Sequence, residues 1–323
     1  MKVRKLLKIQ SVIEESKIPC DMTEEEFRYW SRSKGDWVNI LDMDLVHVVR
    51  ALSLESKLEL ERHDTKIIQK LKPKEVYHLG AQSYVGYSFQ DEFSTLNTNI
   101  NGTHYILSAI KDFSPKSKLY FAGSSEMFGE SKTKKQSETT PFHPRSAYGI
   151  SKVTGFELTR NYREAYSIFA VTGILFNHES PRRGFEFVTR KISHGVARIK
   201  LGLQDKIELG NVKALRDWGH AKDYVEAMWL MLNQKKPEDY VISTGKHFTV
   251  RDFAKLAFEL VDLDYRKYVK VEKKLYRPSE VESLLGNCKK AKRELKWKPK
   301  YDFHKLVEDM VKADLEFVEK EGY

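Results

Sequence analysis

The sequence predicts an α/β protein built on a doubly wound parallel sheet, together with a smaller C-terminal region. Two observations predict this fold. Short apolar runs at residues 75–79, 119–122 and 169–176 end in small polar residues, which is typical of strands buried on both faces. Stretches with apolar residues at helical spacing separate these runs, and strands that alternate with helices form parallel sheets. The pattern is Rossmann-like, and ligands are expected at the carboxyl ends of its strands.

Composition limits the class of protein. The chain has 323 residues, of which 41% are hydrophobic and 32% charged, which suits one large α/β domain or two modest ones. No run approaches the roughly 18 uncharged apolar residues of a membrane span, and no signal peptide follows Met1, so we expect no membrane partner and a cytoplasmic protein. The two cysteines, Cys20 and Cys288, offer neither a disulfide framework nor a metal site.

The net charge of +10 and the pI near 9.2 raise the question of nucleic-acid binding. The basic residues are spread along the chain among 46 acidic ones, and no DNA- or RNA-binding motif is visible. We therefore expect no nucleic-acid partner. An anionic small molecule such as a nucleotide diphosphate explains particular arginines equally well, and a lysine-rich solvated surface explains most of the remaining charge.

Residues 1–65 depart from the expected opening of a dinucleotide-binding protein. Such a protein begins with a strand and a glycine-rich turn, because only glycines let the backbone approach a pyrophosphate closely. Here Gly35 is the only glycine before Gly80, so the first βαβ unit is atypical or incomplete. A helix is expected after a cap at Thr23. A strand is possible at residues 46–49, with Arg50 at its end.

From Thr65 the chain becomes regular. A helix is expected with one apolar face, ending at Lys72-Pro73-Lys74. A strand at residues 75–79 and a turn at residues 80–83 follow, where small residues allow either a flat cofactor against the backbone or an ordinary tight turn. A second helix is expected over residues 97–110. The expected apolar faces comprise Ile67, Ile68 and Leu71 in the first helix, and Ile100, His104, Leu107 and Ile110 in the second.

The stretch from residue 119 to residue 152 carries the strongest chemical signal. Its strand ends in Gly123-Ser124-Ser125-Glu126, at the edge where open α/β sheets bind ligands. Tyr148 and Lys152 stand four residues apart at a helix start and so share one face. A lysine ammonium beside a phenol favours the phenolate, which would make Tyr148 a usable base. The alternative for such a pair is a solvated helix face.

Basic residues cluster after the next strand. Arg182-Arg183-Gly184 suits a phosphate, because a guanidinium donates a planar fork of hydrogen bonds. The alternative for each of these basic residues is that it forms an ordinary salt bridge at the protein surface. Two more helices are expected, one after a cap at Thr249 and one from Asp302 to the C-terminus.

Together these residues resemble the GDP-mannose 4,6-dehydratase family of extended short-chain dehydrogenase/reductases. The resemblance runs from about Thr65 to the end of the chain. The segment Asn-His-Glu-Ser-Pro-Arg-Arg-Gly at residues 177–184 is particular to this family among its relatives. The matching motifs are Leu79 to Ser83, Ser124-Ser125-Glu126, Tyr148 with Lys152, Asn177 to Gly184, Arg216 to Val225, and Tyr276-Arg277-Pro278.

The resemblance implies an NADP-dependent conversion of GDP-mannose to GDP-4-keto-6-deoxymannose by an internal redox cycle, with NADP favoured over NAD. Tyr148, assisted by Lys152, would take the O4 proton, and Glu126 would remove the C5 proton and assist loss of water, while Ser124 keeps the family's hydroxyl in place. A homo-dimer or homo-tetramer is also implied. The implied cofactor contacts are Leu79, Gly80, Ala81, Gln82, Ser83, Tyr148, Lys152, His178 and Arg183. The implied contacts of the GDP-sugar are Ser125, Asn177, Lys191, Arg216, Arg277 and Glu280.

The resemblance also suggests domain bounds and shows where this sequence differs from the family's pattern. We assign residues 1–65 to an atypical N-terminal segment, 66–176 to a Rossmann-like core, and 177–323 to a substrate-binding region interleaved with that core. The family's glycine loop has no counterpart, its acid-leucine pair corresponds to Lys57-Leu58, and a tyrosine near its cofactor corresponds to Ser94. Two alternatives therefore remain. One is an impaired paralogue that binds a nucleotide sugar, and the other is a 4-keto reductase, for which Glu126 would be superfluous.

Overall fold

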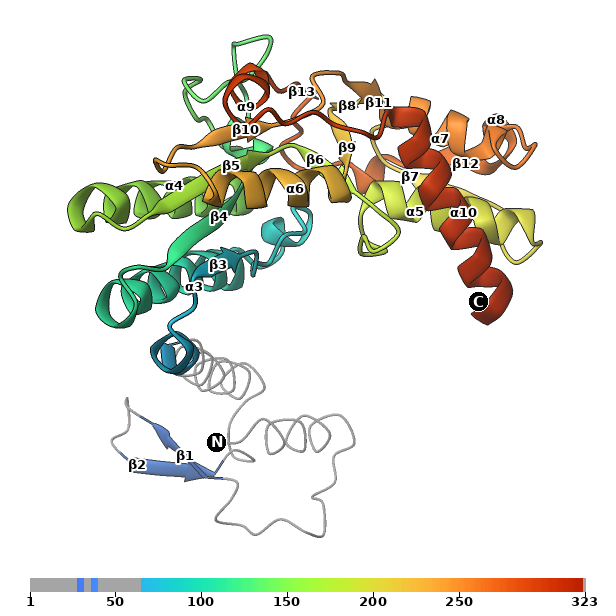
Figure 1. The fold of residues 1–323 in the computed structure, drawn as a ribbon. Coiled ribbons are helices and arrows are strands. Elements are labelled where there is room, and N and C mark those ends of the chain that lie inside the picture. The colour runs from blue at the N-terminus through green and yellow to red at the C-terminus, as the bar shows by residue number, and fades with distance from the viewer. Residues whose placement is uncertain (1–27, 32–35, 40–64, 322–323) are drawn as a thin grey trace. The chain divides into compact units, whose positions relative to one another are not determined.

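The computed structural model describes residues 28–31, 36–39 and 65–321 of this chain (Figure 1). The chain divides into two units, Met1–Leu71 and Lys72–Tyr323, and each is considered by itself. The domain boundaries assigned from the sequence stay a prediction. Several sequence-based assignments lie outside the described residues: the helix after Thr23, the strand at residues 46–49 with Arg50, the pair Lys57-Leu58, Gly35 and Cys20.

The first unit contains an antiparallel strand pair. Strands β1 (Arg28–Ser31) and β2 (Asp36–Asn39) pair with Arg28 opposite Asn39 and Ser31 opposite Asp36. Residues 65–71 are helical, as predicted. The expected apolar face is wrong, since only Ile68 is buried, while Ile67 is 40% and Leu71 66% exposed.

The second unit is organised around a parallel sheet of four strands in the order β10-β5-β4-β3. Its strands are β3 (Glu75–His78), β4 (Lys118–Ser124), β5 (Ala170–Leu175) and β10 (Tyr240–Ile242). The three strands predicted from apolar runs are confirmed as β3, β4 and β5. Among the described residues no strand pairs with the outer edge of β3, where the first βαβ unit of a complete doubly wound sheet would lie.

Helices cover both faces of this sheet, because successive side chains of a buried strand point to opposite faces. Phe121 packs toward α4 (Ala147–Tyr166), together with Phe156 of that helix. Tyr120 packs toward α6 (Ala221–Leu232), together with Tyr224. The sheet is therefore the middle layer of this unit.

Helix α3 (Glu92–Phe113) begins five residues before the predicted start, because Asp91 caps it by accepting a hydrogen bond from the Ser94 amide at 2.8 Å. Its buried face agrees with the expected one at Leu107 and Ile110, which are fully buried. It differs at His104, which is exposed, and at Thr95, Asn99 and Thr103, which are buried. These polar groups are buried because they are hydrogen-bonded, for example Thr103 Oγ1 to His78 Nε2 at 3.0 Å.

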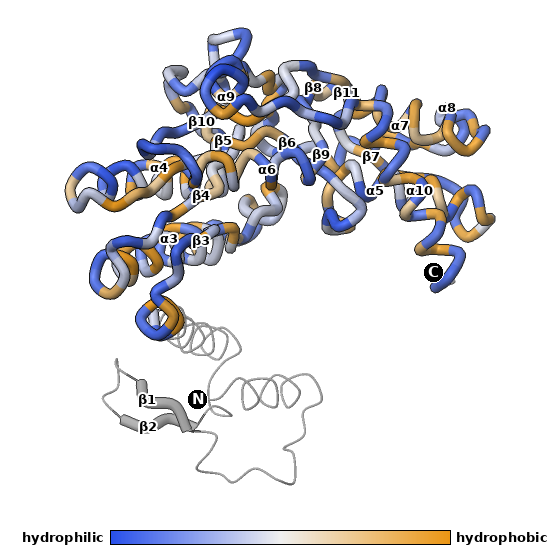
Figure 2. The backbone as a smooth tube through the Cα atoms, in the orientation of Figure 1, coloured by the Kyte–Doolittle hydropathy of each residue, from blue (hydrophilic) through white to orange (hydrophobic). Residues whose placement is uncertain are grey.

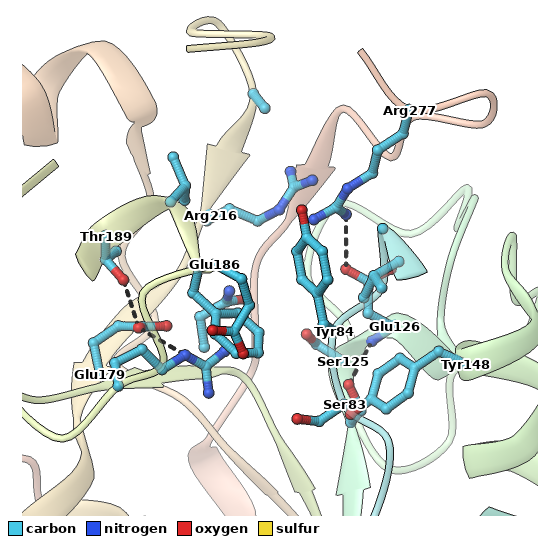
Figure 3. Close-up of a pocket in the computed structure, with 18 of the residues that line it drawn as sticks. Ser83, Tyr84, Ser125, Glu126, Tyr148, Glu179, Glu186, Thr189, Arg216 and Arg277 are labelled. Carbon is cyan, nitrogen blue, oxygen red and sulfur yellow. Dashed lines mark hydrogen bonds and ion pairs between the residues drawn. The ribbon is translucent and has the colours of Figure 1, made fainter. Parts of the chain in front are cut away.

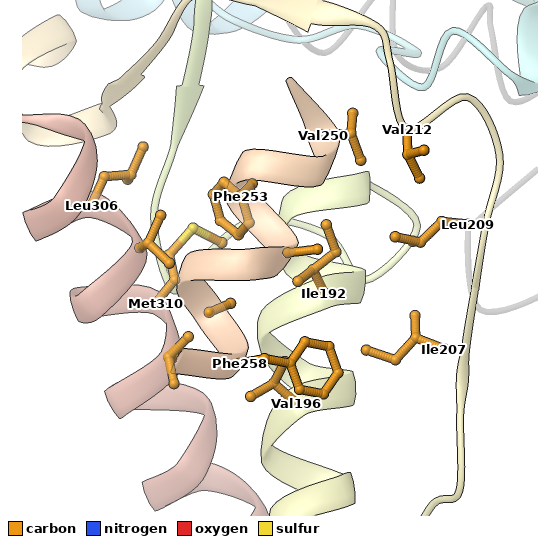
Figure 4. Packing of buried hydrophobic residues seen from close by; sticks show 14 of the residues in the cluster. Ile192, Val196, Ile207, Leu209, Val212, Val250, Phe253, Phe258, Leu306 and Met310 are labelled. Atoms are coloured by element: carbon orange, nitrogen blue, oxygen red, sulfur yellow. The ribbon is translucent and has the colours of Figure 1, made fainter. Parts of the chain in front are cut away.

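The C-terminal region forms a second core between helices (Figure 4). Helices α5 (Val188–Lys200), α7 (Val250–Glu259) and α10 (Phe303–Glu321) pack together. The predicted cap at Thr249 is confirmed, because its hydroxyl accepts from the Asp252 amide at 3.0 Å. The remaining described elements are β6 (Asn177–Glu179), β7 (Ile207–Leu209), β8 (Leu215–Arg216), β9 (Trp218–His220), β11 (Phe248–Thr249), β12 (Val269–Val271), β13 (Ser283–Leu284), α8 (Tyr265–Tyr268), α9 (Lys289–Glu294), η3 (Tyr87–Phe89), η4 (Ser125–Met127) and η5 (Lys273–Leu275).

Hydrophobic residues occur throughout the buried strand β5 of this unit, whereas its helices mix hydrophobic and hydrophilic residues. Figure 2 shows hydrophobic colour over β5, all of whose residues are buried. Helices α5 and α10 instead alternate between hydrophobic and hydrophilic residues along their length. Within residues 28–31, 36–39 and 65–321, no helix combines the length and the apolar character needed to cross a membrane.

Two helical glycines provide a matched test of this packing. A Cβ at Gly155 of α4 would lie 2.3 Å from Phe121 Cζ, whereas a Cβ at Gly102 of α3 would meet no atom within 4 Å. We expect Gly155→Ala to destabilise the protein by about 1–3 kcal/mol, because it overpacks the core. Gly102→Ala should stabilise it by about 0.5–1 kcal/mol, because alanine favours the helix. Urea unfolding of both variants measures these changes, and equal effects would contradict the packing described.

Candidate active site

The carboxyl ends of β3, β4 and β5 open into one cavity of about 780 Å³ (Figure 3). Segments from the second core form the opposite wall, including residues at the starts of α5 and α7. The cavity is therefore at the sheet edge that the sequence predicted. The predicted site residues that line it are Leu79, Ala81, Ser83, Ser124, Ser125, Glu126, Tyr148, Lys152, Asn177, His178, Arg183, Lys191, Arg216, Arg277 and Glu280.

Gly80 and Gln82 do not line this cavity. The Gln82 amide donates to Asn99 Oδ1 at 2.8 Å, and Asn99 Nδ2 donates to the Gln82 carbonyl at 3.0 Å. Asn99 also donates to Ser151 Oγ at 2.9 Å. The buried amide of Asn99 thus ties the loop after β3 to α3 and to α4, which holds the neighbouring loop residues at the cavity wall.

Tyr148, Ser124 and Glu126 are brought together by a close approach of α4 to the end of β4. Ser146 caps α4 by accepting from the Gly149 amide at 3.0 Å, so Tyr148 lies in the first helical turn. A Cβ at Gly149 would lie 2.8 Å from the Glu126 carbonyl oxygen. Glycine at this position therefore lets Tyr148 come close to the turn that carries Ser124 and Glu126.

The phenol of Tyr148 is nearly buried, with 8% of its surface exposed. Burial raises the pKa of Tyr148 above its ordinary value, a hydrogen bond with Ser124 lowers it, the Glu126 carboxylate raises it, and the Arg183 guanidinium lowers it. Burial is the largest of these causes. Positive charge near the phenol, such as that of the Arg183 guanidinium, therefore favours the phenolate.

Lys152 lies near Tyr148, as its place on the same helix face predicted. Its Nζ donates to the Ala122 carbonyl at 2.8 Å and lies 5.8 Å from the centroid of the Tyr148 ring. Burial lowers the pKa of Lys152 to about 8. That Lys152 assists Tyr148 in proton transfer stays a prediction of the sequence, since an ammonium has two further donors beside the one that bonds the strand carbonyl.

His178 lies beside this cluster, stacked on the Tyr224 ring with centroids 5.0 Å apart. Its Nδ1 is 2.9 Å from the Phe176 carbonyl oxygen, so Nδ1 carries the proton and donates it. Burial lowers the pKa of His178, which favours the neutral ring. A neutral imidazole with a fixed tautomer can accept a hydrogen bond at Nε2.

Two arginines of the cavity pair with carboxylates. Arg216 is buried and its Nη2 donates to Glu280 Oε1 at 3.1 Å. Arg277 Nη1 lies 3.8 Å from Glu126 Oε1, so this arginine adjoins the group formed by Ser124, Glu126 and Tyr148. Figure 3 shows both guanidinium groups directed into the cavity. Such paired cations can bind a diphosphate through charge-assisted hydrogen bonds.

The sequence did not predict the group of polar and aromatic side chains around Arg183 that forms a further wall of the cavity. Thr189 Oγ1 donates to Glu179 Oε2 at 2.6 Å, and Arg183 Nε lies 3.1 Å from the same oxygen. The Arg183 guanidinium also lies 3.5 Å from the centroid of the Phe187 ring, against which Tyr84 packs edge-on at 5.6 Å. The signal for Glu179 was its place inside the motif at residues 177–184. Nothing in the sequence marked Tyr84 or Phe187.

Known proteins match this chain over most of its length. A family model described as GDP-mannose 4,6 dehydratase matches residues 46–310. The protein named GDP-mannose 4,6 dehydratase 1 from Arabidopsis thaliana is 52% identical over 255 residues, which cover 78% of this chain and 70% of that protein. The GDP-mannose 4,6 dehydratase of Homo sapiens is 47% identical over 272 residues, which cover 78% of this chain and 73% of that protein.

A solved structure shows the same fold. RMD from Pseudomonas aeruginosa, solved in complex with NADPH, is similar with a TM-score of 0.70 and 23% sequence identity. The similarity covers 76% of this chain and 82% of that chain. The predicted α/β fold with a Rossmann-like parallel sheet is confirmed.

The buried Lys152 predicts a dependence of stability on pH. Because its pKa falls from 10.5 to about 8 on folding, its charge destabilises the fold below pH 8, and one pKa unit corresponds to about 1.4 kcal/mol. We expect Lys152→Met to raise the melting temperature at pH 7 by a few degrees. The gain should shrink as pH rises from about 8 to 10.5, because the unsubstituted protein then loses that charge.

Thermal unfolding over a pH series measures this effect. Lys118→Met is the matched control, since Lys118 Nζ also donates to a backbone carbonyl, that of Leu232 at 2.6 Å, but is only partly buried. A gain that stays constant with pH for Lys152→Met would show that packing, rather than charge, sets the difference.

Proposed function

This chain belongs to the GDP-mannose 4,6-dehydratase family, and from that premise we propose that it removes water from GDP-mannose to give GDP-4-keto-6-deoxymannose. The family match bears out the resemblance seen in the sequence motifs. The observation that carries the proposal is the arrangement of the cavity. A phenol and a carboxylate stand together at the end of β4, and two arginines line the same cavity, one of them 3.8 Å from that carboxylate. That arrangement suits proton transfers on a sugar whose diphosphate is held nearby.

The proposed proton transfers use side chains that line the same part of the cavity. Tyr148 would accept the proton of the sugar O4, with the Ser124 hydroxyl as its hydrogen-bond partner. Glu126 would remove the C5 proton and pass a proton to the departing C6 hydroxyl, so that water leaves. A simple 4-keto reductase would need no base at C5, so the place of Glu126 in this cavity disfavours that alternative.

The proposed ligand contacts are cations for the diphosphate and polar groups for the sugar. We assign the diphosphate and nucleotide to Arg216 and Arg277, with Glu280 holding the buried Arg216 in place. Asn177, Lys191 and Ser125 also line the cavity. We assign them to the sugar and its phosphates because amide, ammonium and hydroxyl groups bind such oxygens.

The residues of the loop after β3 fit part of a nicotinamide dinucleotide. At the end of β3, a Cβ at Gly80 would meet only the His78 ring, at 4.0 Å, so a ligand can approach this backbone, and the nearby Gln82 Oε1 is buried without a partner. When bound, NADP would accept a hydride from C4 and return it to C6. No glycine cradle for the pyrophosphate occurs in the described residues, and only Gly35 precedes Gly80 in the sequence.

That missing cradle favours a second candidate, a protein that binds GDP-mannose without turning it over. Several charge-assisted hydrogen bonds of about 1.5–3 kcal/mol each would be absent from the cofactor site. Tight NADP binding would then depend on residues 1–64, which lie largely outside the described residues. NADP rather than NAD, a homo-dimer or homo-tetramer, and a cytoplasmic location stay predictions of the sequence.

Incubation with GDP-mannose, with and without added NADP, tests the proposal. We expect the mass of the nucleotide sugar to fall by one water, and the rate to rise when NADP is added. Glu126→Gln and Tyr148→Phe should each lower the rate at least about 100-fold, because each removes a proton-transfer group. Both variants should still bind GDP-mannose, as measured by calorimetry.

The controls separate the two candidates. Unchanged substrate mass, with GDP-mannose still bound by the folded protein, would support the binding protein and contradict the dehydratase. Loss of one water by the unsubstituted protein with normal rates in both variants would keep the activity but remove Glu126 and Tyr148 from the mechanism.

A further inference from the structure

The segment at residues 180–187 connects β6 to α5 and carries Arg183 into the cavity. Two turns shape it, with the Arg183 amide donating to the Ser180 carbonyl at 2.9 Å and the Phe187 amide to the Gly184 carbonyl at 3.2 Å. These bonds are local to the segment. Contacts from outside it must therefore fix its position against the cavity.

Arg190 of α5 supplies such contacts. Its Nη1 donates to the carbonyls of both Pro181 and Arg183, the latter at 3.2 Å. Its guanidinium also lies 4.6 Å from the centroid of the Phe185 ring. One buried side chain therefore holds two carbonyls and an aromatic ring of the same segment. We call residues 180–187 the Arg183 loop.

Asp314 of α10 orients this guanidinium from the other side. Its Oδ1 accepts hydrogen bonds from Arg190 Nε at 2.8 Å and pairs with Nη2 at 2.7 Å. Its Oδ2 accepts from Ser193 Oγ at 2.5 Å. Asp314 is fully buried, so its charge depends on these partners. Because Nε and Nη2 both meet Oδ1, Nη1 is left directed at the Arg183 loop, a geometry that only a planar guanidinium provides.

The position of the Arg183 loop matters to the cavity because of where Arg183 lies. Its side chain is held between Glu179 and the Phe187 ring. Its charge also acts on the phenol of Tyr148, whose pKa it lowers. A shift of the loop would move this cation relative to both the cavity wall and the phenol.

We propose that Asp314 is a positioning residue that, acting through Arg190, fixes the Arg183 loop and thereby the Arg183 guanidinium at the cavity. The rival explanation is that the buried pair only fastens α10 to α5. The two differ in one respect, since only the positioning role requires the two carbonyl contacts of Arg190 Nη1.

The chain contains a matched pair away from the cavity. Arg163 donates to both carboxylate oxygens of Asp239, at 2.9 and 2.8 Å, and also to the Ala170 carbonyl at 3.0 Å. Arg163→Lys removes the same fork from a partly buried carboxylate without touching the Arg183 loop. It controls for the general loss of stability that Arg190→Lys brings.

Hydrogen exchange of the full chain, followed by mass spectrometry without ligand, is the first test. We expect amides of the Arg183 loop to exchange roughly tenfold faster in Arg190→Lys and Asp314→Asn than in Arg163→Lys. Ser193→Ala removes only the hydroxyl bond to Asp314 and should give a smaller increase, so the test remains possible if the first two variants fold poorly. Equal loop exchange in all variants would overturn the proposal.

Steady-state kinetics is the second test, and it rests on the proposed function. Because the resemblance assigns Arg183 to the cofactor and its charge acts on the Tyr148 phenol, Arg190→Lys should raise the KM for added NADP roughly tenfold and also lower kcat. Arg163→Lys should leave that KM unchanged. Unchanged KM in both variants would overturn the proposal. If the unsubstituted protein releases no water from GDP-mannose, the proposed function fails, and loop exchange alone decides the inference.

Discussion

The close approach of α4 to the end of β4 is the constraint on which the rest of the site depends. Gly149 and Gly155 lack the Cβ atoms that would strike the Glu126 carbonyl and the Phe121 ring. Helix α4 therefore packs closely against β4, and Tyr148 lies beside Ser124 and Glu126. A larger residue at either position would push the helix away from the strand and so shift the phenol relative to Ser124 and Glu126.

The cationic side chains of the cavity are each fixed in direction by a hydrogen-bond or ion-pair partner. Arg216 is buried against Glu280 and Lys152 against the Ala122 carbonyl, while the partly exposed Arg183 pairs with Glu179. Buried cations of this kind are stable only with partners, and their partners fix their direction. The cavity thus presents oriented positive charge to an anionic ligand without relying on flexible surface lysines. The burial of Tyr148 explains why that positive charge matters for its acidity.

The fold of residues 72–321 could be predicted largely because its signals are local. Apolar runs marked β3, β4 and β5, and the Thr249 cap marked α7. The predictions were wrong where a distant partner decided the outcome. The buried face of α3 holds Asn99 and Thr103, because the loop after β3 and His78 satisfy their hydrogen bonds. No pattern within α3 could reveal those partners.

The sequence by itself determined the family, the parallel sheet and most of the residues that line the cavity, because strand ends and motif residues follow from local order along the chain. Only the tertiary structure decided that Lys152 donates to a strand carbonyl, that Tyr84 and Phe187 form a wall of the cavity, and that Asp314 reaches the Arg183 loop through Arg190. Asp314 and Arg190 are separated by 124 positions in the chain. Contacts between residues so far apart in the sequence depend on how helices pack. That packing is determined by the whole core rather than by any one segment.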